Sequence, residues 1–291
     1  MESITKKRLV KDLREIGVRS GCNLLVSSAI SKVGWIEGGV NTVLESLFDA
    51  VGKEGSIFGN AFTRLYKLPL NKDDARKAFA VDTPAYSGSL INLMLKHPDS
   101  VRSSHPSCSV VGIGPNSHNI LDNHNTTKPA YDAIHSLAKD EIGWMLKLGT
   151  AKVSPGSTTV HVAKDLLGFK NNSIGKLGVS YLDEDGTTKL YVKNYAGGCS
   201  QGFWKFYEHY RDGDALLEGK VGNADSILMN LKKTLEIDLK VLKKDPTFFF
   251  CDDPLCYSCR VSWSFSPESR ITFKLKYLLT KQFPTTKRFF T

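Results

Sequence analysis

Apolar runs and amphipathic segments alternate along the first half of the chain. Over residues 4–17, Leu9, Leu13 and Ile16 recur at helical spacing, and lysines and arginines occupy the opposite face. An apolar run from Cys22 to Val26 follows, and its lack of alternation is typical of a strand buried on both faces. The pattern therefore predicts an amphipathic helix followed by a buried strand.

The same order of elements recurs further along. Strands are predicted at 55–59, 107–114 and 144–149, and helices at 41–51, 87–96 and 130–138, with a further helix that carries His161. Strands that alternate with helices indicate an α/β fold, with a central mixed or parallel sheet flanked by helices. In such sheets ligands bind beyond the carboxyl ends of the strands, where Ser27, Ser28 and Thr63 are expected.

The pattern changes after residue 170. Alternating, aromatic-rich residues on both sides of Asp185-Gly186 predict a β-hairpin within 170–200, which we interpret as a small antiparallel β subdomain. A helix is predicted around 224–244, whereas 246–291 forms a tail without a clear assignment. We expect a single domain over 1–291 that carries this subdomain as an insertion.

Composition is that of an ordinary globular protein, with 41% hydrophobic and 24% charged residues. No run approaches the roughly 20 apolar residues that a membrane span needs. The charged amino terminus is not followed by the apolar stretch of a secretory signal. We therefore expect a cytoplasmic protein without a membrane partner.

Basic residues exceed acidic ones by 39 to 30, which gives a net charge of +9 and favours anionic partners. The basic residues are spread along the chain and form no recognisable nucleic-acid docking motif. A phosphate-bearing cofactor or an anionic sugar fits this charge, and we do not expect a nucleic-acid partner.

Three of the six cysteines, Cys251, Cys256 and Cys259, are spaced as Cys-x4-Cys-x2-Cys. A zinc site normally has four ligands, and the chain offers neither a histidine after His209 nor a fourth cysteine nearby. We therefore interpret these residues as ordinary thiols in a turn and expect no metal.

Two segments about fifty residues apart carry candidate chemistry. Residues 102–109 combine a cation, hydroxyls and an imidazole, and residues 158–164 place His161 behind Thr158 and Thr159 at a predicted helix start. A histidine is the usual base for an attacking amine, because its pKa lies near neutral pH. Hydroxyls and the amides of a helix start are suitable donors to an oxyanion. The two segments therefore suggest an acyl-transfer site.

Four motifs in order make the chain resemble the aminoglycoside 3-N-acetyltransferase family over roughly residues 5–245. They are Leu24-Leu25-Val26-Ser27-Ser28 with Gly34 and Gly38-Gly39 after it, Arg102-Ser103-Ser104-His105-Pro106 with Ser109, Leu148-Gly149 followed by Thr158-Thr159-Val160-His161, and Gly219-Lys220-Val221-Gly222-Asn223-Ala224.

The resemblance implies direct transfer of acetyl from acetyl-CoA to an amine of an amino sugar or aminocyclitol. It also implies an antibiotic N-acetyltransferase-like α/β fold, not a GCN5-like one, in which a small β subdomain helps to form the acceptor pocket. His161 matches the catalytic histidine of the family. The residues that match its coenzyme channel are Ser27, Ser28, Thr158, Arg102, Ser103 and His105.

The chain departs from the family pattern at Lys164, where a carboxylate usually lies three residues after the histidine. Positions three apart share a helix face, so an inward-pointing Lys164 would weaken His161 as a base. Asp165 is the nearest replacement carboxylate, and Asp82 and Glu208 are further candidates for the acceptor site.

The lysine in place of the family's carboxylate at position 164 also changes the acceptor that we expect. Aminoglycosides are polycations that need acidic pockets, so we favour a less cationic amino sugar, or one that carries phosphate or a nucleotide. The alternative is that Lys164 points to solvent and an acidic pocket for an aminoglycoside is built elsewhere.

Two other functions stay open. One is an amide or ester hydrolase with a Ser or Cys nucleophile, for which Cys108 beside His105 is a candidate; the chain lacks a Gly-x-Ser-x-Gly motif. The other is a CoA-binding or carbohydrate-binding relative without catalytic activity.

Overall fold

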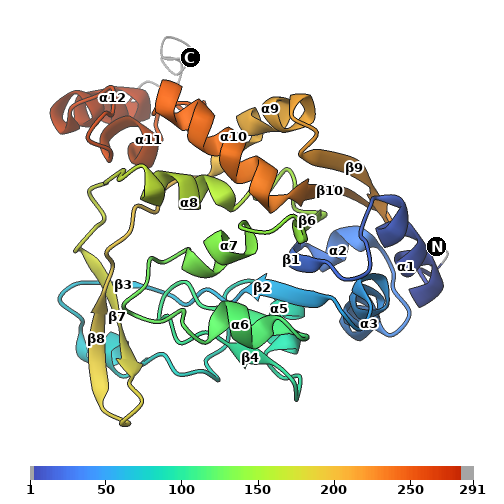
Figure 1. Cartoon of the computed structure of the whole chain (residues 1–291). Coiled ribbons are helices and arrows are strands. Elements are labelled where there is room, and N and C mark those ends of the chain that lie inside the picture. Colours follow the sequence, from blue (N-terminus) through green and yellow to red (C-terminus); the bar gives the residue numbers. More distant parts are fainter. Residues whose placement is uncertain (1–2, 283–291) are drawn as a thin grey trace.

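A seven-stranded mixed sheet forms the centre of the molecule, and a three-stranded antiparallel sheet lies beside it (Figure 1). The computed structural model describes residues 3–282. In spatial order the larger sheet contains β4 (Val101–Arg102), β5 (Val110–Ile113), β2 (Ser56–Asn60), β1 (Asn23–Ser28), β6 (Gly143–Leu148), β10 (Ala224–Asn230) and β9 (Leu216–Val221). The smaller sheet contains β3 (Tyr66–Lys67), β7 (Leu177–Leu182) and β8 (Thr188–Val192). This arrangement confirms the predicted fold class.

The three central strands of the larger sheet are parallel. β1 pairs with β2 on one side and with β6 on the other, so that Leu25 lies opposite both Phe58 and Met145. The outer strands β5, β4, β10 and β9 are antiparallel to their neighbours. Along β1, Leu24 and Val26 enter one hydrophobic core and Leu25 enters the other, which explains why this run is apolar without alternation.

Helices cover both faces of this sheet (Figure 1). The core on one face includes side chains of α1 (Lys6–Glu15), α2 (Ile30–Val33), α3 (Gly39–Val51) and α5 (Ser89–Met94). The core on the other face includes side chains of α6 (Ser117–Leu121), α7 (Asp132–Leu137), α8 (Thr159–Leu166), α9 (Phe206–Asp212) and α10 (Leu231–Lys244). The shorter α4 (Lys72–Ala75) and the 3-10 helix η1 (Gln201–Lys205) lie in connecting segments.

The helix predicted over 224–244 was wrong in its first seven residues. That part of the chain is β10, which pairs with β6 and with β9, and Val221 lies opposite Ala224 across a tight turn. Gly222 in this turn has a φ of +59°, which a side-chain-free residue adopts readily. Helix α10 begins only after Asn230, whose side chain accepts a hydrogen bond from the backbone N–H of Lys233 at 3.0 Å.

The Asp-Gly signal at 185–186 lies in the turn between β7 and β8, as predicted. β3 from an earlier part of the chain pairs with β7 and completes the small sheet. The hairpin is therefore part of a three-stranded sheet.

The segment after α10 packs onto the body of the protein. Phe249, Cys259 and Trp263 belong to the same core as α8 and α10, and α11 (Tyr257–Val261) and α12 (Arg270–Gln282) follow. Residues 283–291 of the predicted tail lie outside the described residues. Between residues 3 and 282, no helix is both long and apolar enough to cross a membrane.

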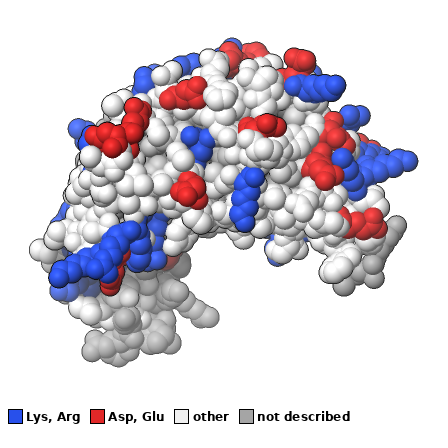
Figure 2. Space-filling view, turned by 90° about the horizontal axis from the view of Figure 1, so that it is seen from below, with Lys and Arg blue, Asp and Glu red and all other residues white. Residues whose placement is uncertain are grey.

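Basic and acidic side chains are mixed on one face of the molecule. On the face shown in Figure 2, Lys and Arg side chains are intermixed with Asp and Glu side chains over much of the area. The excess charge of +9 does not form one uninterrupted basic stripe on this face. This face therefore differs from the clustered basic surface of a typical nucleic-acid-binding protein.

Replacement of Leu25 by alanine should cost about 2–5 kcal/mol of the free energy of unfolding, because Leu25 is fully buried in the central strand. Leu190→Ala on β8 is the matched control, since that side chain is 51% exposed, and its cost should stay below about 1 kcal/mol. Urea unfolding of both variants measures the difference. If the two variants lost equal amounts of the free energy of unfolding, the assignment of β1 to the core would be wrong.

Candidate active site

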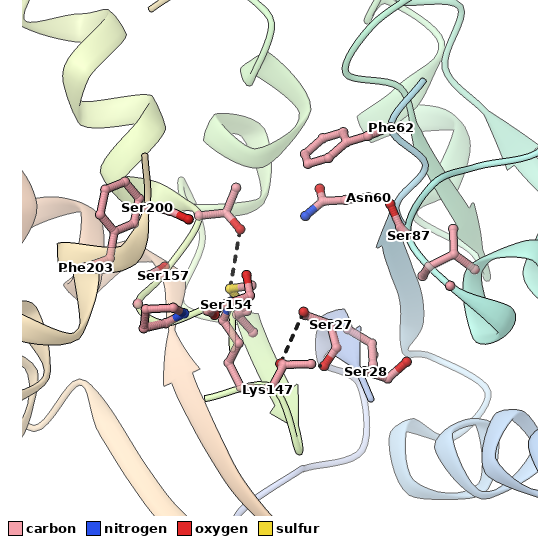
Figure 3. A pocket seen from close by; sticks show the side chains of 18 of the residues that line it. Ser27, Ser28, Asn60, Phe62, Ser87, Lys147, Ser154, Ser157, Ser200 and Phe203 are labelled. Carbon is pink, nitrogen blue, oxygen red and sulfur yellow. Dashed lines mark hydrogen bonds between the residues drawn. The ribbon is translucent and has the colours of Figure 1, made fainter. Parts of the chain in front are cut away.

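A cavity of about 490 Å³ lies beyond the carboxyl ends of β1, β2 and β6. Because these three strands are parallel, their last residues meet at one edge of the sheet. We call this space the strand-end cavity. Its polar lining includes Ser27, Ser28, Asn60, Lys147, Ser157, Thr158 and His161. In Figure 3, Ser200 and Phe203 lie on one side of the cavity, and Asn60, Phe62 and Ser87 lie on the other.

A second cavity, of about 1020 Å³, lies between the small sheet and the segment that contains α11. We call it the lysine-lined cavity, because Lys67, Lys176 and Lys193 contribute to its wall. The described residues that line it include no Asp or Glu. His161 and Phe62 line both cavities, so the imidazole lies at the boundary between them.

His161 is held by aromatic rings. It lies in the first turns of α8, and the Tyr131 ring, at the start of α7, stacks on it with the centroids 4.7 Å apart and the planes within 9°. Phe203 packs at a tilt, 5.1 Å from the imidazole. Nδ1 of His161 is buried and has no hydrogen-bond partner. The packing fixes the ring position without a carboxylate bound to Nδ1.

Burial lowers the pKa of His161 well below its usual value of 6.5, and the charges of Lys164, Lys147 and Lys193 lower it further. The imidazole is therefore neutral at physiological pH. A neutral imidazole can accept a proton, although its reduced pKa makes it a weaker base than a free histidine.

Lys164 lies fully buried on α8 and lines neither of the two cavities. Its ammonium group lies 4.9–5.2 Å from the ring centroids of Phe203, Phe249 and Trp263, and Nζ donates to the Gly197 carbonyl at 3.4 Å. Burial lowers its pKa to about 7. The Lys164 side chain thus points into the protein and not to solvent. Its ammonium group lies among three aromatic rings and does not face either cavity.

The two threonines before His161 face different surroundings. Thr158 lines the strand-end cavity, and its hydroxyl donates to the sulfur of Met145 at 3.6 Å. Thr159 is fully buried, and its hydroxyl donates to Oδ2 of Asp238 at 2.6 Å. Burial raises the pKa of Asp238 to about 8. Thr158 can therefore reach a ligand in the cavity, whereas Thr159 anchors the start of α8 to α10.

The remaining carboxylates proposed from the sequence do not contact His161. Oδ2 of Asp165 is buried without a hydrogen-bond partner, and burial raises the pKa of this group to about 6. Asp165 borders a separate small pocket. Asp82 and Glu208 are exposed and line neither cavity.

Of the residues proposed for a coenzyme channel, Ser27 and Ser28 line the strand-end cavity. Arg102 instead donates to the carbonyls of Ala61, Val81 and Thr83 inside the protein. These bonds tie the end of β2 to the loop before α5, and burial lowers the pKa of Arg102 to about 10.

Ser103 and His105 also have internal partners. The Ser103 hydroxyl accepts from the Val110 amide at 2.9 Å, and Nδ1 of His105 accepts from the Cys108 amide at 3.0 Å. His105 is fully buried, and burial lowers its pKa to about 3. The structure places Arg102, Ser103 and His105 in the framework behind the site and not on the wall of the strand-end cavity.

Cys108 lines the lysine-lined cavity, and burial raises the pKa of its thiol to about 11. The thiolate is the nucleophilic form of cysteine, so a thiol held neutral at physiological pH is a poor nucleophile. The geometry therefore gives no support to a covalent acyl-cysteine.

Sequence reasoning missed Lys147, Tyr131 and Asp238. Lys147 extends from β6, its Nζ donates to the Ser154 carbonyl at 2.6 Å, and burial lowers its pKa to about 7. The available signal was a lone lysine within an otherwise apolar predicted strand. Tyr131 and Asp238 had no such signal, because both act through tertiary contacts.

A family model described as aminoglycoside 3-N-acetyltransferase matches residues 25–243. Aminoglycoside N(3)-acetyltransferase VIII of Streptomyces fradiae is 32% identical over 139 residues, which are 43% of this chain and 49% of that protein. Aminoglycoside N(3)-acetyltransferase III of Salmonella sp is 33% identical over 132 residues, or 41% of this chain and 46% of that protein. The chain thus spans about half the length of the curated relatives it matches.

Solved structures share the fold. AAC-IIIb in a binary complex with CoASH superposes with a TM-score of 0.71 at 21% identity, over 84% of this chain and 97% of that one. The YokD protein from Bacillus subtilis superposes with a TM-score of 0.72 at 23% identity. The superposition covers 85% of this chain and 96% of the YokD chain. At this identity the likeness establishes the fold alone.

Lys147 makes a pH-dependent contribution to stability that can be measured. Its pKa is about 7 in the folded protein and 10.5 in the unfolded chain, so the folded state loses its proton first as pH rises. Wild-type stability should therefore increase relative to Lys147→Met by up to about 2 kcal/mol between about pH 7.5 and about pH 9. Urea unfolding at both pH values measures this change.

Lys243→Met is the matched control, because Lys243 is exposed on α10. Its stability difference from wild type should be the same at both pH values. A pH-independent difference for Lys147→Met as well would mean that the Lys147 ammonium is not desolvated in the folded protein.

Proposed function

Because this chain belongs to the aminoglycoside 3-N-acetyltransferase family, we propose that it transfers acetyl from acetyl-CoA to an amine of an amino sugar or aminocyclitol. The observation that carries this proposal is the position of His161, which lines both cavities. Two substrates that enter from different cavities would meet at this side chain. Direct transfer needs that arrangement, since the amine must reach the thioester carbonyl without an enzyme-bound acyl group.

We place acetyl-CoA in the strand-end cavity. Parallel strands direct ligands to their carboxyl ends, and the hydroxyls of Ser27, Ser28 and Thr158 are available there as donors. The fold neighbour AAC-IIIb was solved with CoASH, which is consistent with a coenzyme on this fold. Lys147 in its protonated form at the cavity wall would stabilise the oxygen of a polarised thioester.

His161 acts as the general base in this proposal. The amine nitrogen attacks the thioester carbonyl, a C–N bond forms, and the nitrogen becomes strongly acidic in the tetrahedral intermediate. The neutral imidazole accepts this proton, the C–S bond breaks, and the proton passes to the departing CoA sulfur. A base with a lowered pKa suits this sequence, because it takes a proton from an acidic nitrogen and releases it readily to a thiolate.

Thr158 is the side chain best placed to stabilise the oxyanion. It lines the strand-end cavity directly before α8, and its hydroxyl makes no capping bond to the helix. Among the described residues its hydroxyl donates only to the sulfur of Met145, a weak acceptor, so the donor can turn toward a carbonyl oxygen at little cost. Thr159 cannot take this role while its hydroxyl is bonded to Asp238.

The charge of the lysine-lined cavity indicates the class of acceptor. Lys67, Lys176 and Lys193 lie on its wall, and no carboxylate of the described residues balances them there. A polycationic aminoglycoside would be repelled, whereas an amino sugar that carries phosphate or a nucleotide would be attracted. We therefore propose an anionic amino-sugar acceptor that presents its amine to His161.

An inactive CoA-binding relative is the second candidate, and one observation favours it. Nδ1 of His161 has no hydrogen-bond partner, so no carboxylate orients the ring or stabilises an imidazolium. Such a protein would bind CoA with a measurable heat but release no thiol with any acceptor. Calorimetry and a free-thiol assay on the same preparation distinguish the two functions.

The variant His161→Gln should lower kcat by about 10²–10⁴-fold, because it removes the proton acceptor but keeps a side chain of similar size. Affinity for acetyl-CoA should change little. Thiol release and calorimetry measure the two quantities. His118→Gln is the control, since His118 is exposed on α6 and pairs with Asp122, and wild-type turnover in His161→Gln would exclude a general base at this position.

Nucleotide-linked amino sugars should be acetylated with a higher kcat/KM than kanamycin-type aminoglycosides, and added salt should reduce that preference. Lys176→Gln should raise KM for the anionic acceptor several-fold, because it removes one charge from the cavity wall. The exposed Lys243→Gln on α10 is the control. Efficient turnover of aminoglycosides alone would contradict an anionic acceptor while leaving acetyl transfer itself intact.

A further inference from the structure

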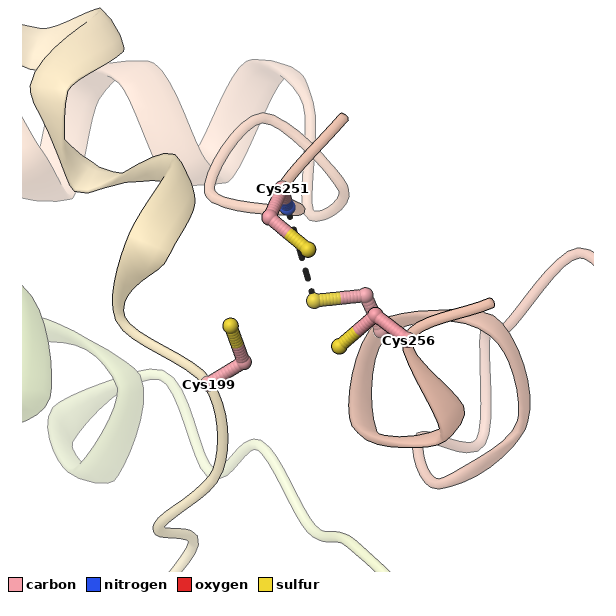
Figure 4. Close-up of side chains that lie close together, drawn as sticks. Cys199, Cys251 and Cys256 are labelled. Carbon is pink, nitrogen blue, oxygen red and sulfur yellow. Dashed lines mark hydrogen bonds between the residues drawn. The ribbon is translucent and has the colours of Figure 1, made fainter. Parts of the chain in front are cut away.

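Four cysteines converge at one point behind the lysine-lined cavity. The sulfur atoms of Cys199, Cys251, Cys256 and Cys259 all lie within 4.8 Å of one another. Figure 4 shows the labelled side chains of Cys199, Cys251 and Cys256 with their sulfurs directed toward a common centre. The cluster is distinct from His161, because none of the four cysteines lines either cavity.

The ligand set comes from two separate parts of the chain. Cys251 and Cys256 lie in the loop before α11 and Cys259 lies on α11 itself, whereas Cys199 lies about fifty residues earlier, two residues before η1. The sequence indicated only three ligands, and the fold brings in the fourth. This contact overturns the argument that the three thiols of the loop lack a fourth partner.

The spacing of the sulfurs matches a single tetrahedral ion. Zn–S bonds of about 2.3 Å place the sulfurs of a tetrahedron about 3.8 Å apart, and no two sulfurs of the cluster are more than 4.8 Å apart. Four uncharged S–H groups form only weak hydrogen bonds with one another, so thiol–thiol contacts alone give little stabilisation to such a cluster. All four cysteines are free of disulfides.

Backbone amides already support the sulfurs. The Cys251 N–H donates to Sγ of Cys259 and the Gln201 N–H donates to Sγ of Cys199, each at 3.4 Å. Such bonds stabilise thiolate ligands and fix their directions. The loop is fixed as well, because Arg260 donates to the carbonyls of Cys251 and Asp253.

Basic groups lie beside the cluster. Nζ of Lys205 is 2.7 Å from a carboxylate oxygen of Asp252 and also donates to the Phe250 carbonyl at 2.8 Å. Arg260 donates to the Cys251 carbonyl at 2.9 Å. One Zn²⁺ with four thiolates carries a net charge of −2, and Arg260 offsets part of it, whereas the charge of Lys205 is already balanced by Asp252.

We propose that Cys199, Cys251, Cys256 and Cys259 bind one Zn²⁺ ion as a structural tetrathiolate site. Four protein ligands leave no open position for a water or a substrate, so the ion has no catalytic role. Its effect is to join the segment around Cys199 to the loop before α11.

The proposed ion would hold one wall of the lysine-lined cavity in place. Gly197, Gly198, Tyr257 and Ser258 line that cavity, and each lies within two residues of a proposed ligand. Without the ion, the two segments would be joined by apolar contacts and by polar bonds such as the one that the Cys199 N–H donates to the Ser258 hydroxyl at 3.0 Å. The site therefore links metal binding to the shape of the acceptor pocket and not to the strand-end cavity.

Elemental analysis of the full chain, purified without chelators from medium that contains zinc, tests the proposal. We expect about one zinc per chain, and substitution of Co²⁺ should give the intense visible bands of tetrahedral cobalt thiolate. Cys256→Ser should lose the metal, whereas Cys22→Ser, which alters a buried cysteine elsewhere, should keep it.

Wild-type protein with less than about a tenth of an equivalent of any metal, and with all six thiols reactive after unfolding, would overturn the proposal. Because metal content is measured without an acceptor, this outcome is independent of acetyl transfer. In an active preparation, chelation should raise KM for the acceptor more than KM for acetyl-CoA. The reverse order would contradict a role at the acceptor wall.

Discussion

The parallel pairing of β1 with both β2 and β6 is the constraint on which the rest of the structure depends. It brings Ser28, Asn60 and Leu148 to one edge of the sheet and so creates the strand-end cavity. The chain that leaves β6 at this edge leads directly into α8, which carries His161. A slip of one residue in β1 would exchange the faces of Leu24 and Leu25 and so expel one apolar set from its core.

Burial determines the chemistry at this edge. Tyr131 and Phe203 remove water from around His161, and desolvation is the largest cause of its lowered pKa. Nearby lysines act in the same direction, so the environment is both poorly hydrated and positive. In the proposed function, such a site would keep His161 neutral and would favour an anionic acceptor. The same two properties therefore underlie both the proposed transfer and the proposed class of acceptor.

The fold class and the strand-end position of Ser27 and Ser28 could be predicted from the sequence, because both follow from periodicity and from the rules of parallel sheets. The internal role of Arg102 could not, since residue type does not distinguish a buried framework bond from a ligand contact. The strand at 224–230 was missed because its apolar residues also fit helical spacing. Cys199 could not be linked to the cysteines of the loop, because only tertiary packing brings it there.

The most direct test of the central claim is a crystal structure of the full chain with acetyl-CoA or CoA. The account predicts that the thioester or thiol end lies in the strand-end cavity, within reach of His161 and Thr158, while the lysine-lined cavity stays free for the acceptor. Coenzyme density in the lysine-lined cavity, or a coenzyme sulfur remote from His161, would contradict it.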